Sequence, residues 1–238
     1  MALETTPTHP LADSYVTEAE ADAYLANRKD IANYSALTSG QKEAVLKLAT
    51  KQIDSLRFHG EAIFEDPMYF RLPQALKFPS CHQEQKSGSI ESVNGKKVIC
   101  PALKNIATLP DDFWNDGALI ITNGTGKGKT YKVVNFISET GEVEIEQAFS
   151  PAPDSTSTFI ITVRVPLKVK YAVCEQALYL CNGGGERQKL QSEGVKSFSI
   201  GDLSETFADN MIGSGKIAIS NEAKGLLKGL YTIIGRLT

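Results

Sequence analysis

A glycine-rich segment with two lysines is the part of this chain whose residue types most suggest chemistry. Residues 124–130 read Gly-Thr-Gly-Lys-Gly-Lys-Thr, and this ending resembles that of a phosphate-binding P-loop. Asn123 stands where the P-loop pattern requires its first glycine. A P-loop also leads directly into a helix, whereas Tyr131–Val134 has the composition of a strand. We therefore expect a glycine-rich β-turn here and no nucleotide site.

The cysteine and histidine residues form no recognisable metal or nucleophile pattern. Four cysteines without C-x-x-C spacing predict reduced, mostly buried thiols in a chain of 238 residues. Cys81, His82 and Cys100 could supply three zinc ligands, but their spacing matches no zinc module. No histidine has a serine or cysteine and a carboxylate at a spacing that the sequence can bring together. We expect no enzyme activity, no catalytic or metal-binding residue and no cofactor.

Three glutamates alternate with apolar residues late in the chain. Glu142, Glu144 and Glu146 flank Val143 and Ile145, which places the carboxylates on one face of a strand. An acid–base pair or a cation site is one interpretation of this pattern. The regular alternation favours a solvated sheet face instead.

The overall charge and hydropathy exclude some classes of protein. Hydrophobic residues make up 42% of the chain, which is enough for a core, and the net charge is −3. That charge argues against a large surface that binds nucleic acid by neutralising phosphates. No apolar run is long enough to span a bilayer, and residues 1–14 lack the features of a secretion signal, so we expect a soluble protein made in the cytoplasm.

Helical patterns occupy the two ends of the chain. Thr17 and Glu20 form a capping box before a short helix that ends near residue 28, and a longer helix is predicted over 40–58. Pro166 starts a third helix that the glycines after residue 182 end. A last helix is predicted over 219–231, after the capping residues at 220–222.

The middle of the chain has the pattern of β structure. Asn94-Gly95 predicts a hairpin, and four later runs alternate or are rich in β-branched residues. These runs are residues 118–122, 130–137, 142–147 and 158–163. Trp114 falls in a predicted turn just before them.

Together these patterns predict an α+β fold with two domains. Residues 14–90 and 164–238 form a helical bundle domain, interrupted by an inserted antiparallel β domain over 91–163. Residues 1–13 form a flexible N-terminal arm. The helix that begins at Pro166 is apolar on most sides, so it lies either in the middle of a bundle or between a bundle and a neighbouring subunit.

Several motifs, taken in order, carry a family resemblance. They are Tyr15-x-Thr17-x-x-Glu20-Ala21, Gln41-x-x-Ala44, Val165-Pro166-x-x-Val169-Lys170 and Glu193-Gly194-Val195-Lys196-Ser197. Over residues 14–80 and 164–232 the chain resembles the head-tail connector (adaptor) proteins of long-tailed bacteriophages. The usual Leu-x-Trp-Pro-Arg of that family is Leu76-Lys77-Phe78-Pro79-Ser80 here, so the role of its arginine cannot be transferred. Phe113–Gly128 and Pro153–Ser157 look like a small β module that recurs in phage virion proteins.

The resemblance implies a structural ring protein, most often a dodecamer, in the neck of a virion. The ring would lie between the portal protein and the downstream neck, stopper or tail protein, and genomic DNA would pass through it without sequence-specific contacts. The expected subunit interface consists of Leu167, Tyr171, Val173, Leu178 and Leu180. The expected portal contact consists of Val195, Phe198, Ile200, Leu203, Phe207, Leu226 and Leu230.

One alternative function comes from the same resemblance. Some relatives carry a label that links them to primosomal single-stranded-DNA-binding proteins. The basic residues are scattered and interleave with no aromatic run, so the sequence shows no stacking platform for bases. The acidic pI makes us expect weak DNA binding.

Overall fold

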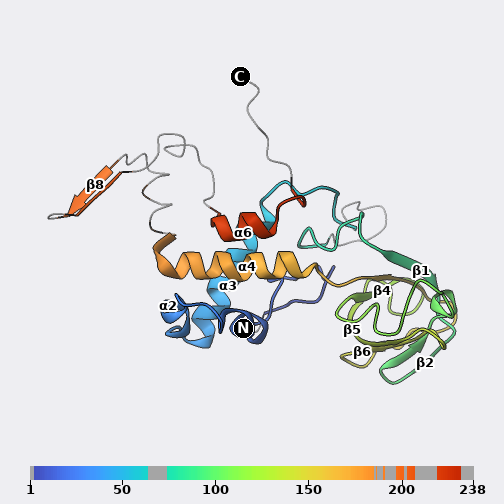
Figure 1. The fold of residues 1–238 in the computed structure, drawn as a ribbon. Coiled ribbons are helices and arrows are strands. Elements are labelled where there is room, and N and C mark those ends of the chain that lie inside the picture. Colours follow the sequence, from blue (N-terminus) through green and yellow to red (C-terminus); the bar gives the residue numbers. More distant parts are fainter. Residues whose placement is uncertain are drawn as a thin grey trace. The chain divides into compact units, whose positions relative to one another are not determined.

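A computed structural model describes residues 3–63, 74–184, 197–200, 203–206 and 219–231, together with Glu186 and Leu190. The chain divides into two compact units (Figure 1). The helical unit contains the described residues of Val16–Leu56 and Lys168–Gly229. The sheet unit contains those of Leu3–Tyr15 and Arg57–Leu167, together with Leu230 and Tyr231.

The first three helices of the helical unit are set by their caps. Helix α1 (Glu18–Leu25) begins with the predicted capping box, in which the Thr17 and Glu20 side chains each bond the other's backbone N–H. Helix α2 (Ala32–Ser35) is a single turn. Helix α3 (Ser39–Asp54) has a second capping box, between Thr38 and Gln41. It ends four residues before the predicted end at Phe58, which instead pairs with another segment.

Helix α4 (Leu167–Tyr179) is followed by a π-helical turn, η2 (Leu180–Gly184), and then by the short helix α6 (Asn221–Leu226). Residues 172–178 of α4 are all buried, including two polar ones. The Gln176 amide donates to Gln52 Oε1 of α3 at 2.7 Å and accepts from the Ser220 N–H at 2.8 Å. Since the Ser220 hydroxyl caps α6, this buried amide connects three helices.

A buried carboxylate holds α4 against α1. The Glu175 side chain is only 4% exposed, and its Oε2 lies 3.0 Å from an Arg28 guanidinium nitrogen. The Tyr24 hydroxyl donates to Glu175 Oε1 at 2.8 Å, and the Tyr24 ring stacks on Tyr171 with centroids 4.4 Å apart. Burial first, and then this hydrogen bond, raises the pKa of Tyr24. The charge is therefore buried with the partners that buried charges require.

Seven strands of the sheet unit form one antiparallel sheet. The strands are β1 (Gln85–Ser89), β2 (Ser92–Asn94), β3 (Lys97–Ile99), β4 (Ala118–Asn123), β5 (Thr130–Ile137), β6 (Glu142–Ile145) and β7 (Thr158–Thr162). Their order across the sheet is β1-β7-β4-β5-β6-β3-β2. A 3-10 turn, η1 (Pro101–Leu103), follows β3.

The two edge strands are consecutive in the chain, so the sheet curls until its ends meet. Only Ile90 and Glu91 separate β1 from β2. The Ile90 N–H donates to Ser157 O beside β7, and the Glu91 N–H donates to Ile99 O of β3. One continuous segment thus borders both ends of the sheet, and large apolar side chains fill the space inside it, among them Trp114, Phe136 and Phe159.

The β2–β3 hairpin exists, but its loop is one residue later than Asn94-Gly95 predicts. Asn94 pairs with Lys97, so the two loop residues are Gly95 and Lys96. Gly95 has φ +63°, whereas Lys96 is not in the left-handed region. A glycine at the first loop position is the requirement of a type II′ turn, and the sequence satisfies it equally well.

A second, two-stranded sheet consists of β8 (Ser197–Ile200) and β9 (Leu203–Thr206), paired antiparallel. The sequence predicts only an extended polar segment there. The pairing runs from Ser197 with Thr206 to Ile200 with Leu203.

The predicted helical bundle is wrong, because the fold is mainly β. The described residues contain five α-helices, and three of them have eight residues or fewer. The two longer helices, α3 and α4, cross in Figure 1 and do not run side by side. The last helix ends at Leu226 and not at 231, since Gly225 and Gly229 disfavour its continuation. The seven-stranded antiparallel sheet therefore dominates the architecture; the predicted domain boundaries stay a prediction.

Candidate nucleic-acid site

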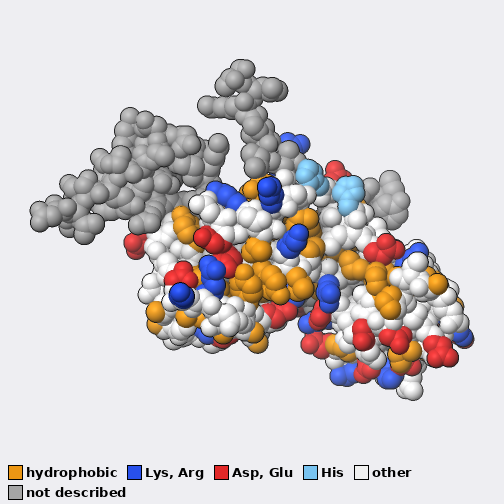
Figure 2. All heavy atoms as spheres, viewed as in Figure 1, with side chains coloured by type: hydrophobic (Ala, Val, Ile, Leu, Met, Phe, Trp, Pro, Cys, Tyr) orange, Lys and Arg blue, Asp and Glu red, His pale blue; other side chains and the backbone are white. Residues whose placement is uncertain are grey.

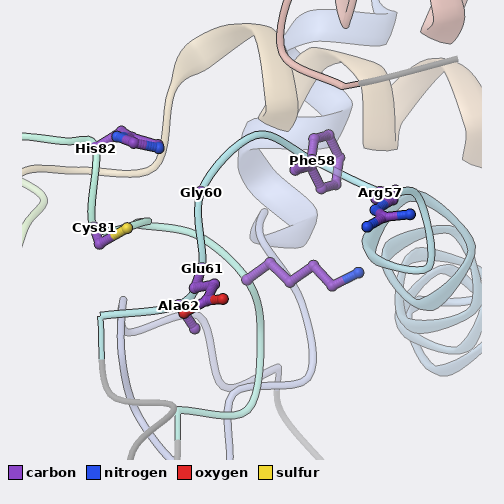
Figure 3. A pocket seen from close by; sticks show the side chains of 8 residues that line it. Arg57, Phe58, Gly60, Glu61, Ala62, Cys81 and His82 are labelled. Atoms are coloured by element: carbon purple, nitrogen blue, oxygen red, sulfur yellow. The ribbon is translucent and has the colours of Figure 1, made fainter.

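A cavity of about 490 Å³ opens in the sheet unit, between two segments that lie before the first strand (Figure 3). Its volume is within the range of small-molecule sites. It combines three side chains that can carry positive charge with one carboxylate, one thiol and an apolar surface. The lining residues are Arg57, Phe58, Gly60, Glu61, Ala62, Lys77, Cys81 and His82.

Backbone hydrogen bonds hold the two segments together. Ala62 forms a β-bridge with Ser80, and the Cys81 N–H donates to Glu61 O at 2.8 Å. On the other side, Phe58 bridges to Tyr231, and the His59 N–H donates to Leu230 O at 2.9 Å. The cavity walls are thus positioned by pairing between segments far apart in the sequence.

An aromatic cluster fixes the apolar side of the cavity. The Phe58 ring packs edge-to-face on Phe78 and on Tyr231, with centroids 4.7 and 6.5 Å away. The Tyr15 hydroxyl accepts from the Phe78 N–H at 3.1 Å, and the two rings lie 6.1 Å apart. Phe58 is therefore 8% exposed and is held in place on several sides.

Gly60 allows the chain to turn close beneath His82. Its φ of +81° lies in the left-handed region, and a Cβ at this position would come within 2.3 Å of His82 Cδ2. A larger residue would therefore strain the backbone and displace the His82 ring.

Charged side chains surround this apolar surface. Arg57 and His82 are exposed and lie on opposite sides of the cavity in Figure 3, with Gly60 between them. Lys77 is half-buried. Glu61 is also exposed, and its carboxylate makes no hydrogen bond or ion pair with any other described residue. The site can therefore offer cations to an anion and one acceptor to a hydrogen-bond donor.

The loop that carries Lys77 is fixed by amide side chains. Gln74 Nε2 donates to Leu76 O at 2.6 Å and to Pro79 O at 3.0 Å. The Ser80 N–H donates to Gln83 Oε1 at 2.9 Å. These bonds satisfy backbone groups in a loop without regular structure, which keeps the lysine near the cavity.

The glycine-rich segment is a β-turn, as predicted. It connects β4 to β5, so a strand follows it. The Thr125 hydroxyl donates to Asp154 Oδ2 at 2.7 Å, and Ser157 Oγ donates to Thr125 O at 3.1 Å. Hydrogen bonds from Thr156 and Thr125 lower the Asp154 pKa to about 2. The β4–β5 turn and the loop before β7 therefore anchor each other.

The glutamate-rich strand has a solvated face, as predicted. Val143 and Ile145 of β6 are fully buried, while Glu142 and Glu144 are partly exposed. Lys97 Nζ of the neighbouring strand lies 2.7 Å from Glu142 and 3.9 Å from Glu144. Across the described ranges, no group of three His, Cys, Asp or Glu side chains could hold a metal ion.

The residues of the expected subunit interface do not lie on one exposed face. Val173 and Leu178 are at most 2% exposed within the single chain, Tyr171 and Leu180 are half-buried, and Leu167 is 46% exposed. Tyr171 stacks on Tyr24 of its own chain. The interface itself stays a prediction.

The residues of the expected portal contact are only partly described. Val195 and Phe207 lie outside the described residues. Phe198 and Ile200 are in β8 and Leu203 is in β9, but the structure describes only their backbone. Leu226 and Leu230 are half-buried. This contact also stays a prediction.

The four thiols differ in their exposure to solvent. Cys100 and Cys174 are buried, which raises the pKa of each thiol to about 12, while Cys81 is exposed. Trp114, predicted in a turn, is fully buried in the sheet core. No helix in the described part of the chain is long and apolar enough to cross a membrane.

Comparison with protein families gives one match. A family model described as "Putative DnaT-like ssDNA binding protein" matches residues 1–92. The matched region contains every residue that lines the cavity. No curated protein matches the chain.

The family match overturns the resemblance to phage head-tail connectors. It concerns single-stranded-DNA binding, and neither it nor the fold points to a connector or another virion protein. The short motifs that carried the resemblance include capping boxes and apolar helix faces, which unrelated helices also share. The ring, the portal and tail partners and the virion location stay untested predictions without other support.

Sequence reasoning missed the cavity because its residues are not regularly spaced. Arg57 and Lys77 are twenty positions apart, and a chain segment rich in prolines and aromatics separates them. Gly60, just after the helix end predicted at Phe58, was the one local signal, since a glycine there predicts a change in chain direction.

Proposed function

We propose that this protein binds single-stranded DNA, with the cavity between residues 57–62 and 77–82 as its contact site. The observation that carries the proposal is the cationic cavity within the segment similar to single-stranded-DNA-binding proteins. Arg57 and Lys77 neutralise backbone phosphates, and the apolar side at Phe58 and Ala62 covers part of a sugar or base.

The charge distribution supports a small, local contact. The net charge is −3, and acidic and basic side chains alternate over the face shown in Figure 2. The described residues of this face therefore form no long basic groove that would attract a DNA strand. Few phosphates are neutralised, so binding is weak and moderately sensitive to salt.

Fluorescence anisotropy with a labelled 20-nucleotide strand tests the proposal. Two neutralised phosphates give a slope of about −1.4 in a plot of log K against log salt. An unlabelled single strand should compete better than a duplex of the same length, because the duplex hides its bases.

A double variant tests the position of the site. Arg57→Gln with Lys77→Gln should weaken binding at least 10-fold at 50 mM salt and bring the slope close to zero, since both cations are removed. Lys127→Gln with Lys129→Gln removes two exposed cations from the β4–β5 turn of the same unit and is the matched control. Absence of binding by the wild-type protein at low salt would refute the function, and an equal loss in both variants would refute the site.

A further inference from the structure

The carboxylate in the cavity is unexpected for a site that binds a polyanion. Glu61 lines the same cavity as Arg57, Lys77 and His82, and a negative charge there repels phosphate. It has no ion pair or hydrogen bond with another described residue that would give it a structural role. Its backbone alone serves the fold, through the Glu61 O that accepts from the Cys81 N–H.

We infer that Glu61 selects bases that carry an exocyclic amino group and so, among the pyrimidines, cytosine over thymine or uracil. This inference rests on the proposed single-stranded-DNA binding. An ionised carboxylate only accepts hydrogen bonds, so it pairs with the N4 amino group of cytosine and repels the O4 carbonyl oxygen of thymine or uracil.

The surrounding residues allow a base to reach this acceptor. The Phe58 ring is fixed by Phe78 and Tyr231, so the apolar side of the cavity keeps its shape when it is occupied. Figure 3 shows Glu61 and Ala62 together on one side of the cavity and Phe58 on another. A base that enters between them covers apolar surface and presents its edge to the carboxylate, while its phosphate remains near the cations.

This geometry also gives a reason for a preference for single strands. The amino groups of a duplex are already paired on their Watson–Crick edges, whereas an unpaired base can turn its edge into a cavity. The backbone around Glu61 is fixed by the Ala62–Ser80 bridge, so the acceptor stays in place without DNA.

Two strands that differ only at C4 and N3 of the base test the inference. Twenty-nucleotide strands of deoxycytidine and deoxyuridine share the same backbone and ring size, and differ at the C4 amino or oxo group and the adjacent N3. At pH 7.5, the wild-type protein should bind the cytosine strand about 5- to 10-fold more tightly, the effect of one exposed charge-assisted hydrogen bond.

Glu61→Gln should bring this ratio close to one, because an amide can accept from the amino group or donate to the oxo group. Glu84→Gln removes an exposed carboxylate of the same unit outside the cavity lining and is the matched control. It should leave the ratio unchanged.

The outcomes separate the inference from the proposed function. Equal binding of both strands by the wild-type protein, or an unchanged ratio in Glu61→Gln, overturns the role of Glu61 and leaves single-stranded-DNA binding intact. Tighter and equally increased binding of both strands by Glu61→Gln also overturns it, since the carboxylate then only repels phosphate. If neither strand binds at low salt, the proposed function itself fails.

Discussion

Replacing Glu175 with glutamine should destabilise the helical unit selectively. The substitution keeps the size and shape of a side chain that is 4% exposed, but removes its charge. Arg28 then loses the partner 3.0 Å away, and its remaining acidic neighbour, Asp30, lies 3.9 Å from Arg28 Nε. Tyr24 keeps an oxygen acceptor, so its hydrogen bond becomes a neutral one.

The structure sets the size of this effect. A hydrogen bond to a charged group contributes about 1.5–3 kcal/mol, and removal of one partner of a fully buried ion pair costs about 3–5 kcal/mol. The Arg28 side chain is 37% exposed, so water replaces part of the lost interaction. We therefore expect Glu175→Gln to lower the free energy of unfolding by about 2 kcal/mol, or the urea midpoint by about 1 M.

Two spectroscopic probes report on the two units. Trp114 is the single tryptophan and is fully buried in the core of the sheet unit, so its fluorescence follows the unfolding of the sheet. The five described α-helices have most of their residues in the helical unit, so ellipticity at 222 nm follows that unit. Urea titration of Glu175→Gln should move the ellipticity midpoint and leave the fluorescence midpoint in place.

A matched substitution separates burial from charge. Glu142→Gln makes the same chemical change in an ion pair with Lys97, whose side chain is 48% exposed, and should move neither midpoint measurably. If Glu175→Gln is as stable as the wild-type protein, the buried pair contributes nothing net. If both probes shift equally, the loss is not confined to the helical unit, and the reasoning from local contacts is wrong.

Three further predictions concern the sheet unit and the thiols. The Asp154 pKa of about 2 lies below its ordinary value of 3.8. The carboxylate therefore stabilises the fold above about pH 4, and this contribution is lost as the pH falls toward 2. Asp154→Asn should reduce the change in the urea midpoint, followed by Trp114 fluorescence, between pH 5 and pH 3. With a thiol reagent at pH 8, the exposed Cys81 should react fast, and Cys81→Ser should abolish this reaction. The buried thiols of Cys100 and Cys174 should react only on unfolding. Gly117→Ala should lower the free energy of unfolding in urea by at least about 3 kcal/mol, because the new Cβ would lie 2.0 Å from the Thr162 carbonyl oxygen. Gly40→Ala is the control, since the space around that position is open.

The sequence predicts elements well where the signal is local. The Thr17–Glu20 capping box, the Ser220 cap and the span of β5 agree with the structure, since each depends on residues a few positions apart. Strand β1 was missed because Gln-Lys-Ser-Gly-Ser contains neither β-branched nor aromatic residues. It is a strand only because β7 offers it an edge to pair with.

The fold class could not be predicted from the same signals. Helix lengths depend on where glycines and tertiary contacts end them, and Phe58 leaves the pattern of α3 to pair with Tyr231, 173 positions later. The apolar surface of α4 left open whether its own bundle or a second subunit covers it. Val173 and Leu178 are buried in the single chain, and the subunit interface stays a prediction. Hydrophobic periodicity shows that a face is covered, but not by which partner.

The candidate site depends on such distant pairings more than any other part of the chain. Gly60 turns the chain between Arg57 and Glu61, and the bridge between Ala62 and Ser80 brings Cys81 and His82 beside that turn. The net charge of −3 argued against nucleic-acid binding. A net charge does not show where the individual charges lie, so it says nothing about a local cluster of cations. In the proposed function, two cations and one carboxylate around a fixed apolar surface form the contact for an unpaired nucleotide. The charge next to the cavity, and not the net charge of the chain, would then decide whether a strand binds.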